Sequence, residues 1–481
     1  MVVGEITEER DLIIIGGGPG GYTAAIRAAQ LGLEVTLVEQ ADLGGICLNQ
    51  GCIPSKVWTH AAKKKSEIPQ MQKMGLDVST GEIDLDTLID YKSQITEQLR
   101  KGVEALCQAN KIEVIQGKAT FTGGDRIGVE YGHQFDTYLF DKAIIATGST
   151  AVFPEHFPKQ GERIFLSHDI FNFKEIPEHL IVYGRDLIAF EMATTYQSFG
   201  SKVTLIQDDD INLDQAIEKE LKRSLKKKKI RLIKKDSLKS IEETDEGVIV
   251  SLTDDKGKEQ TIEGSHLYTS GDRQPNLEPL GIDRFGIGQT SDGHIIVNNT
   301  MQSSIPSIYA IGDVTEGPSL AIKAIKQGKV AAEAIAGKNP EVDLTFLPTI
   351  MHTTPPIASV GLTEQEAEEH DLDIHVGQFN LNANGYAKLT GQTDGMIKVI
   401  SDANTEIILG IHMIGEGAIE LSSTFVQLLE MAAKVEDVTF PLYAHPSTNE
   451  GLLEAVDALT GQSIHLPPTK QQTKIVERSL T

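Results

Sequence analysis

Two cysteines lie close together in the stretch "GGICLNQGCIPSK", where four residues separate Cys47 from Cys52. Glycines on both sides and Pro54 just beyond predict a loop that leads into a helix. Two thiols at this spacing can close a small disulfide, and the positive end of a helix favours a thiolate. The same residues can also be two small buried thiols that never react. Because the spacing is poor for zinc and the chain has no second pair, we predict no metal site.

A glycine-rich turn precedes the cysteines in "DLIIIGGGPGGYTAAIRAAQLGLEVTLVEQ". A β-branched strand leads into the turn, and an Ala-rich helix and a second strand follow. The glycines fit G-x-G-x-x-G at Gly16, Gly18 and Gly21, and Glu39 follows 23 residues after Gly16. A pyrophosphate can approach the backbone of such a turn at the helix N-terminus, while the acid binds ribose hydroxyls. The pattern therefore predicts a dinucleotide-binding unit.

The chain repeats this unit 168 residues later, where "FGSKVTLIQ" aligns with "LGLEVTLVE" and Gly184 takes the place of Gly16. Three key positions differ in the second copy. The second glycine is replaced by Asp186, the third by Ala189, and the acid by Gln207. Alanine is tolerated at the third position. The second copy thus has the architecture of a dinucleotide-binding unit with altered chemistry.

Asp186 is the most consequential of these changes, because its side chain is expected in the path of a dianionic pyrophosphate. Two like charges about 4 Å apart repel by about 1 kcal/mol in water and about 4 kcal/mol at an effective dielectric of 20. Gln207 can still bind a ribose hydroxyl, but without assistance from a charge. The sequence "QDDD" offers no arginine for a 2′-phosphate. We therefore predict that NADP is disfavoured and that NAD binding is impaired.

Further motifs appear in a fixed order along the chain. They are "AIIATGS" (143–149), "YAIGDV" (309–314), "IASVGLTE" (357–364) and "YAHPSTNEGLLEAV" (443–456). Together with "GGGPGG" and the cysteine stretch, they resemble the flavin-dependent disulfide reductases, the class I pyridine nucleotide-disulfide oxidoreductase family. Within that family they are most similar to the dihydrolipoamide dehydrogenases, the E3 components of 2-oxoacid dehydrogenase complexes. The resemblance covers residues from about 8 to about 466.

The resemblance implies an α/β fold with two Rossmann-like FAD/NAD(P)-binding domains and an α+β C-terminal dimerisation domain. It implies these boundaries: a split FAD-binding domain at 1–150 and 278–345, an NAD-binding-like domain with a degenerate glycine motif at 151–277, and a dimerisation domain at 346–466. The remaining residues, 467–481, form a polar tail that we expect to be mobile.

The resemblance also assigns roles to individual residues. Cys52 would be the thiolate stacked against the flavin, and Cys47 the thiol that exchanges with substrate. Lys56 would lie beside the flavin and pair with Glu191, which the pattern of residues alone does not single out. The residues implied to bind FAD are Gly16, Gly18, Gly21, Glu39, Gly45, Lys56, Thr147, Gly148, Asp313 and Ala321, while Gly184 would belong to the second nucleotide site.

"AHPSTNE" supplies a candidate base. By itself, one of 13 histidines in a proline-containing loop is more often structural. The resemblance implies instead that His445 takes a proton from a substrate thiol and that Glu450 orients the imidazole and stabilises its cation. In the family this loop reaches the partner's disulfide across a two-fold dimer, so we expect a homodimer in which each active site needs two chains.

The cysteine and histidine motifs agree with the family pattern, whereas the nicotinamide half departs from it. Besides Asp186 and Gln207, Asp272 stands in "TSGDRQPN" and Tyr386 replaces a commonly basic residue. We predict an FAD-dependent oxidoreductase that acts on dihydrolipoamide, a similar dithiol or a lipoyl domain, with NAD as an impaired acceptor. The alternatives are an acceptor that is not a pyridine nucleotide (oxygen, a quinone or another protein) and an assembly protein with little turnover.

Composition narrows the remaining possibilities. A net charge of −25 argues against nucleic-acid and anionic membrane surfaces. There is no run of about 18 apolar residues, and "MVVGEITEER" resembles no targeting peptide, so we expect a cytoplasmic protein without membrane insertion. The basic run "KRSLKKKKIRLIKK" predicts a solvated helix face that leads into a strand. The helical spacing around Cys107 predicts a buried structural thiol.

Overall fold

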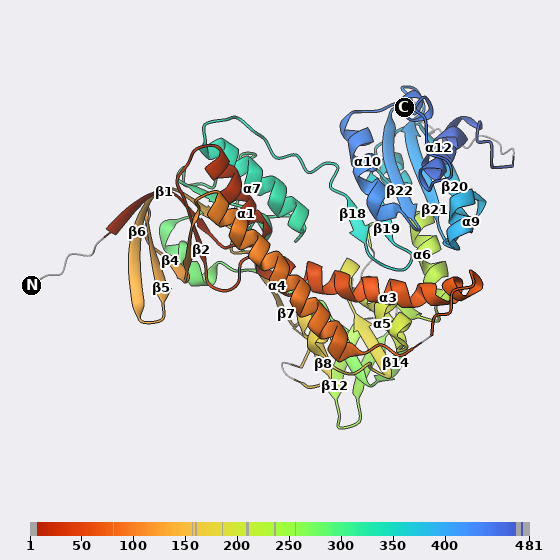
Figure 1. Cartoon of the computed structure of the whole chain (residues 1–481), viewed down its shortest axis with the longest axis horizontal. Helices are drawn as coiled ribbons and strands as arrows, with labels where there is room; N and C mark the ends of the chain where they lie inside the picture. Colours follow the sequence, from red (N-terminus) through yellow and green to blue (C-terminus); the bar gives the residue numbers. More distant parts are fainter. Residues whose placement is uncertain are drawn as a thin grey trace, which may run out of the picture.

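The computed structural model describes residues 7–79, 81–155, 157–158, 161–184, 186–207, 211–234, 237–254, 256–467 and 473–474. Figure 1 shows three regions: an N-terminal α/β unit, a second α/β unit, and a C-terminal sheet flanked by helices. This arrangement confirms the predicted α/β class with a separate C-terminal domain. No described helix is long and apolar enough to cross a membrane.

The N-terminal unit is built on a mixed sheet. Its strands run in the order β3 (Glu113–Gln116), β2 (Val35–Glu39), β1 (Thr7–Ile15), β6 (Gln134–Ile145), β5 (Arg126–Tyr131) and β4 (Lys118–Gly123), with β17 (Ile308–Ala310) also on β6. The pairs that involve β1, β2, β3 and β17 are parallel, whereas β4 and β5 add an antiparallel hairpin. Since β17 comes from far along the chain, the unit is assembled from two separate segments.

The central strand β1 is buried on both faces. Leu12 and Ile14 pack on one side with α1 (Pro19–Gln30) and α7 (Ala321–Ile335), while Ile13 and Ile15 pack on the other. Alternate residues of a strand point to opposite faces, so a continuous apolar run suits a sheet covered on both sides. Helices α1 and α7 approach closely at Gly328, where an added Cβ would lie 2.6 Å from the carbonyl oxygen of Gly20. The apolar run thus fixes the first glycine turn at the edge of a rigid core.

The second α/β unit repeats this design. Its parallel sheet has the order β11 (Arg231–Lys234), β10 (Lys202–Gln207), β9 (His179–Tyr183), β15 (His266–Thr269) and β8 (Ile164–Leu166). Helix α5 (Leu187–Phe199) follows β9, and α6 (Gln215–Lys227) precedes β11. The basic run therefore forms the end of a helix and a strand, as predicted. Two smaller sheets complete the region: β12 (Ser237–Glu243), β13 (Val248–Thr253) and β14 (Glu259–Gly264), and β7 (Ser149–Val152) with β16 (Asp272–Pro275).

The C-terminal domain is an antiparallel sheet covered by helices. Its strands run in the order β18 (Thr349–Met351), β19 (Ile357–Gly361), β22 (Ile408–Ile414), β21 (Met396–Asp402), β20 (Ile374–Asn380) and β23 (Thr473–Lys474). Its helices are α8 (Glu364–Glu369), α9 (Gly385–Thr390), α10 (Ala418–Glu430), α11 (Val435–Thr439) and α12 (Asn449–Asp457). The predicted mobile tail lies outside the described residues except for 467 and 473–474, and the latter pair with β20.

Two long helices connect these regions. Helix α3 (Cys52–Lys73) packs against α5 of the second unit, and Trp58 of α3 shares one apolar core with Phe190 of α5 and Met351 of β18. In Figure 1, α3 crosses the middle of the molecule between the second unit and the C-terminal domain. Helix α4 (Leu85–Ala109) has Asp84 as its N-cap, and the Asp84 side chain accepts the backbone N–H of Thr87. Cys107 of α4 is buried, as predicted.

Candidate active site

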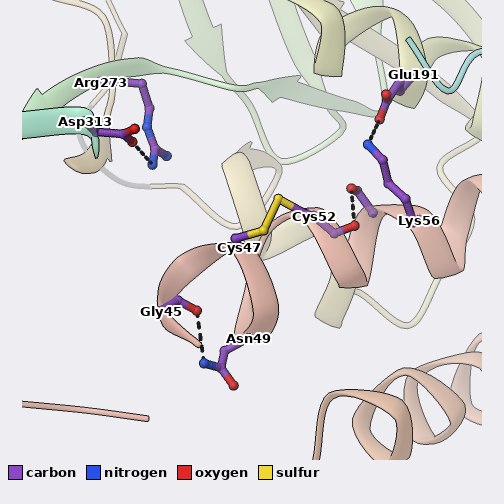
Figure 2. Close-up of a disulfide and its surroundings, with 9 residues drawn as sticks. Gly45, Cys47, Asn49, Cys52, Lys56, Glu191, Arg273 and Asp313 are labelled. Carbon is purple, nitrogen blue, oxygen red and sulfur yellow. Dashed lines mark hydrogen bonds and ion pairs between the residues drawn. A yellow bond between two sulfur atoms is a disulfide. The ribbon is translucent and has the colours of Figure 1, made fainter. Parts of the chain in front are cut away.

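Cys47 and Cys52 form a disulfide, with their Cα atoms 4.7 Å apart. Cys47 lies in the short helix α2 (Gly45–Asn49), and Cys52 is the first residue of α3 (Figure 2). The side-chain amide of Asn49 donates to the backbone carbonyl of Gly45 at 3.0 Å and so holds the turn closed. Gly45 has φ +58°, and an added Cβ would lie 2.8 Å from the Cα of Gly18. The absence of a side chain at Gly45 therefore seats the disulfide helix against the first glycine turn.

Lys56 lies one helical turn beyond Cys52 and points to the second unit (Figure 2). Its Nζ is 2.7 Å from Oε2 of Glu191, whose side chain is only 2% exposed. The other oxygen, Oε1, accepts the backbone N–H of His352 at 2.8 Å. Burial, followed by the charge of Lys56, lowers the pKa of the His352 imidazole, so the ring is neutral at neutral pH. The carboxylate of Glu191, on α5 of the second unit, is thus held by one group from α3 and one from the C-terminal domain.

A cavity of about 1300 Å³ opens beside the disulfide. Its wall includes the following sequence-predicted residues: Gly16, Gly18, Glu39, Gly45, Cys47, Cys52, Lys56, Thr147, Gly148, Gly184, Asp186, Glu191, Asp313 and Ala321. Gly21 is absent from the wall, because its role is packing: an added Cβ would lie 1.8 Å from the carbonyl oxygen of Gly16. The structure therefore gathers residues from both dinucleotide units and from the cysteine motif around one space.

One end of this cavity suits the adenosine half of a dinucleotide. Gly18 is the N-cap of α1 and offers no side-chain acceptor to the helix, so the first backbone N–H groups stay available to a phosphate. Glu39 accepts the N–H of Gly17 at 2.6 Å and that of Ala41 at 2.8 Å. These two bonds hold the carboxylate at the cavity wall, and each oxygen has a further lone pair for a ribose hydroxyl.

The other flank of the cavity carries a polar network that the sequence analysis did not single out. Oδ2 of Asp313 accepts the hydroxyl of Ser149 at 2.6 Å and lies 3.7 Å from the guanidinium of Arg273 (Figure 2). Nε of Arg273 donates to the same hydroxyl at 3.0 Å. The neighbouring Asp272, which the sequence analysis noted as a departure, is exposed. The motif "TSGDRQPN" does not predict the pairing of Arg273 with Asp313, because the two residues are far apart in the sequence.

Asp186 does not simply project into the second nucleotide turn. It is the N-cap of α5, and its Oδ1 accepts the backbone N–H of Ala189 at 2.9 Å. The carboxylate therefore occupies the helix N-terminus that a pyrophosphate would use. Gln207 is buried at the end of β10, and it is absent from the cavity wall. Asp186 therefore caps a helix of the second unit, and Gln207 is part of its buried interior.

His445 and Glu450 form a hydrogen-bonded pair, with Nδ1 of the ring 2.7 Å from Oε1. The second oxygen, Oε2, accepts the N–H of Ser447 at 2.8 Å. Burial opposes the charge on Glu450, but the bonds from His445 and Ser447 outweigh it and lower the pKa of this carboxyl. The His445 side chain is 82% exposed, and neither residue of the pair lies in the cavity wall. One chain therefore orients the imidazole without bringing it to the disulfide cavity.

Comparison with known proteins agrees with this geometry. The family model described as "Pyridine nucleotide-disulphide oxidoreductase" matches residues 10–328, and the model of the dimerisation domain of that family matches 347–456. Dihydrolipoyl dehydrogenase of Geobacillus stearothermophilus is 37% identical over 470 residues, covering 97% of this chain and 99% of the relative. The enzyme of the same name from Halobacterium salinarum is 35% identical over 471 residues, covering 97% and 99%.

Two solved structures share the fold over almost the whole chain. LpdA from Mycobacterium tuberculosis has a TM-score of 0.86 at 24% identity and covers 93% of this chain and 99% of its own. A cysteine-to-serine mutant of RclA, an HOCl-induced flavoprotein disulfide reductase from Escherichia coli solved as a Cu(II) complex, has a TM-score of 0.84 at 25% identity. It covers 93% of this chain and 99% of its own.

Proposed function

This chain belongs to the pyridine nucleotide-disulphide oxidoreductase family, and on that premise we propose that it oxidises dihydrolipoamide or a similar dithiol through FAD. Membership makes the chain a flavoprotein disulfide oxidoreductase with a redox-active Cys47–Cys52 pair, and the matched dimerisation domain implies a homodimer. The observation that carries the proposal is the position of the disulfide in the wall of a dinucleotide-sized cavity, beside the Lys56–Glu191 pair.

The residues of the cavity fit FAD. We assign its binding to the set implied by the sequence, with the pyrophosphate at the open N-terminus of α1 and a ribose at Glu39. Lys56, held by the buried carboxylate of Glu191, would present a fixed positive charge to the flavin ring. When bound, FAD supplies a two-electron acceptor for the reduced cysteine pair. The chain itself provides the disulfide, the proton acceptor and the geometry.

The thiol chemistry follows from the disulfide and the His445–Glu450 pair. His445 of the partner subunit takes a proton from one substrate thiol, and the substrate sulfur then attacks Cys47. The Cys47–Cys52 bond breaks, and Cys52 leaves as a thiolate at the positive end of α3. The second substrate sulfur then displaces Cys47, which takes the proton of that second thiol, so that the substrate leaves as a disulfide and the enzyme pair is reduced to a Cys47 thiol and a Cys52 thiolate. Two electrons and two protons pass from the substrate to the enzyme.

The need for a partner subunit rests on the exposed face around His445. Phe440 and Leu442, which precede it in the chain, are 90% and 101% exposed. Large apolar side chains in such a position mark an interaction surface. A two-fold dimer would cover these side chains and carry the His445–Glu450 pair of each chain to the other chain's disulfide.

We assign NAD the role of an impaired acceptor. A second candidate acceptor is one that is not a pyridine nucleotide, and the specific observation that favours it is the self-capped N-terminus of α5. Oxidation of the reduced flavin by such an acceptor needs no nucleotide site. Free dihydrolipoamide and the lipoyl domain of a 2-oxoacid dehydrogenase-type complex carry the same dithiol, so the same thiol chemistry applies to both.

The test is an anaerobic titration of the purified flavoprotein, followed by flavin absorbance. Dihydrolipoamide is expected to bleach the flavin of the wild-type protein. Cys47→Ser should lose this reduction, because no disulfide is left for the substrate to attack, whereas Cys107→Ala, a buried cysteine on α4, should retain it. Failure of dihydrolipoamide to reduce the wild-type flavin would rule out the proposed substrate class.

A further inference from the structure

The two helix N-termini that face the cavity differ in the side chain at the N-cap. The N-cap of α1 is Gly18, with φ −68° and ψ −177°, and the N-cap of α5 is Asp186, with φ −86° and ψ 169°. The backbone is therefore nearly the same at both positions. Only the second helix has a side-chain acceptor, because Oδ1 of Asp186 takes the N–H of Ala189. In the second turn, the Asp186 carboxylate already occupies the helix N-terminus, whereas in the first turn the same position is available to a bound phosphate.

Burial and the charge of Glu191 favour a neutral Asp186 carboxyl, whereas the other groups around it favour the ionised form. Glu191, on the same helix, adds a second negative charge, although Lys56 of α3 pairs with it. Burial, followed by the charges of Asp186 and Glu191, raises the pKa of the nearby Tyr268 on β15, so that this phenol stays neutral. On the opposite side, the hydroxyl of Ser270 and the charge of Arg273 on β16 favour the ionised form.

We propose that the Asp186 carboxylate acts as an internal occupant of the phosphate subsite of the second unit, so that a pyridine nucleotide binds well only when this carboxyl is protonated. The inference rests on the proposed function and deepens it, since it makes use of NAD by the flavin dependent on pH. A protonated carboxyl has no charge to repel a pyrophosphate and can donate a hydrogen bond to it. Asp186 would thus determine which electron partner the reduced flavin meets.

The direction of the pH effect follows from the surroundings of Asp186. Burial, the largest influence, raises the pKa of its carboxyl, while the bonds from Ala189 and Ser270 oppose this and the charge of Glu191 adds to it. As the pH falls through this raised pKa, the carboxylate becomes neutral and the repulsion disappears. Nucleotide affinity is therefore expected to increase as the pH falls and to decrease as the pH rises.

The experiment measures NADH binding to the FAD-loaded protein under anaerobic conditions, as the dependence of flavin reduction on NADH concentration, from about pH 5 to about pH 8. Asp186→Asn removes the charge but keeps a capping oxygen, and asparagine caps helices as well as aspartate does. Asp186→Gly also frees the N–H of Ala189. Asp84→Asn is the matched control, since it makes the same change at the N-cap of α4.

For the wild-type protein and the control variant, we expect the apparent Kd for NADH to rise about tenfold or more as the pH rises across this range. Asp186→Asn should bind NADH about tenfold more tightly than wild type at the upper pH, with a flat profile, and Asp186→Gly at least as tightly. The inference is overturned if both variants keep the affinity and the pH profile of the wild type, or if neither binds NADH at any pH.

The inference and the proposed function fail in different ways. Reduction of the flavin by dihydrolipoamide tests the proposed function without any nucleotide. If dihydrolipoamide reduces the wild-type flavin while the Asp186 variants gain no affinity for NADH, only the role of Asp186 is wrong. If dihydrolipoamide does not reduce the flavin but Asp186→Asn binds NADH more tightly, the role of Asp186 stands and the dithiol substrate is wrong. The flavin content of each variant, read from its absorbance, excludes loss of FAD as the cause of either result.

Discussion

The first and second glycine turns share one design and differ in what they leave available. Both follow a buried parallel strand and open a helix at the wall of the same cavity. Gly16 has φ +105°, and an added Cβ there would lie 2.4 Å from the carbonyl oxygen of Ala146. Gly184 has φ +158°, and the nearest atom to an added Cβ is the Cβ of Ala189, at 3.2 Å. The second turn is opened enough to accommodate that methyl group. A common backbone plan therefore does not ensure common chemistry, because a single N-cap side chain can use the donors that a ligand needs.

The second unit also has a structural role. Asp214, the N-cap of α6, accepts a hydrogen bond from Nζ of Lys398 at 2.7 Å, with exposures of 0% and 1%. Glu364 of α8 pairs with the same Nζ. This buried cluster joins the second unit to the C-terminal domain, and α5 packs on α3 in a shared core. The unit therefore supports the fold even where its nucleotide turn is altered.

The largest expected effect comes from breaking this cluster. Lys398→Met leaves the buried Asp214 without its cation and beside a second carboxylate, so the free energy of unfolding should fall by about 3–5 kcal/mol. Denaturant unfolding of the flavoprotein measures this change. Lys329→Met, at an exposed lysine of α7, is the control and should change stability by less than about 0.5 kcal/mol. Equal stability of the two variants would mean that the cluster does not hold the domains together.

The next largest effect is expected from a substitution that gives the first turn the N-cap residue of the second. Gly18→Asp places a carboxylate at the open N-terminus of α1, where an added Cβ meets only the Cα of Gly45, at 4.0 Å. Repulsion of about 1–4 kcal/mol should weaken FAD binding by about tenfold to a thousandfold. The ratio of flavin to protein absorbance after desalting measures the loss. Gly18→Asn tests the space without the charge and should retain more FAD than Gly18→Asp.

Gly102→Asp provides the matched control for the Gly18 variants. Gly102 lies on α4, and an added Cβ there has no described atom within 4 Å. The same glycine-to-aspartate change should therefore leave the flavin content at the wild-type value. Full FAD content in Gly18→Asp would contradict the conclusion that a charged N-cap closes a dinucleotide turn.

The smallest effect concerns stability at the second turn. Asp186→Ala removes the N-cap of α5 and should cost about 1 kcal/mol. Because burial raises the pKa of Asp186, its contribution is fully present below the ordinary aspartate value of 3.8 and is lost as the pH rises through the folded pKa. The cost of Asp186→Ala should thus grow as the pH falls, as denaturant unfolding at several pH values would show.

Asp84 supplies the opposite case. The N–H and hydroxyl of Thr87 lower the pKa of this exposed N-cap, so its contribution is present above the ordinary value and is lost as the pH falls through the lowered one. The cost of Asp84→Ala should therefore shrink with falling pH. Parallel pH trends for Asp84→Ala and Asp186→Ala would show that burial does not distinguish the two caps.

Much of the site could be predicted from the sequence, for reasons that are local. The strand, turn and helix of each unit and the proximity of Cys47 and Cys52 depend on residues close together in the chain. The His445–Glu450 pair is also local, but its role was predicted only from the family resemblance. The Lys56–Glu191 pair spans 135 residues and was predicted only from the family resemblance. The Arg273–Asp313 pair and the N–H of His352 on Glu191 were missed, because no local pattern records such long-range contacts.

Residue types and short spacings were sufficient for the two dinucleotide units and for the conclusion that the second is altered, while the fold class as a whole followed from the family resemblance. They did not reveal how it is altered: an aspartate in a glycine turn can point into the ligand path or bond to its own helix, and both are compatible with the same letters. In the structure, Oδ1 of Asp186 accepts the N–H of Ala189 on its own helix. Ser270 and Arg273, which come from a distant segment, act on the same carboxyl, and only the tertiary structure brings them there. The residue type determines the chemistry of which a side chain is capable, whereas contacts between distant segments determine the burial and the charges around it.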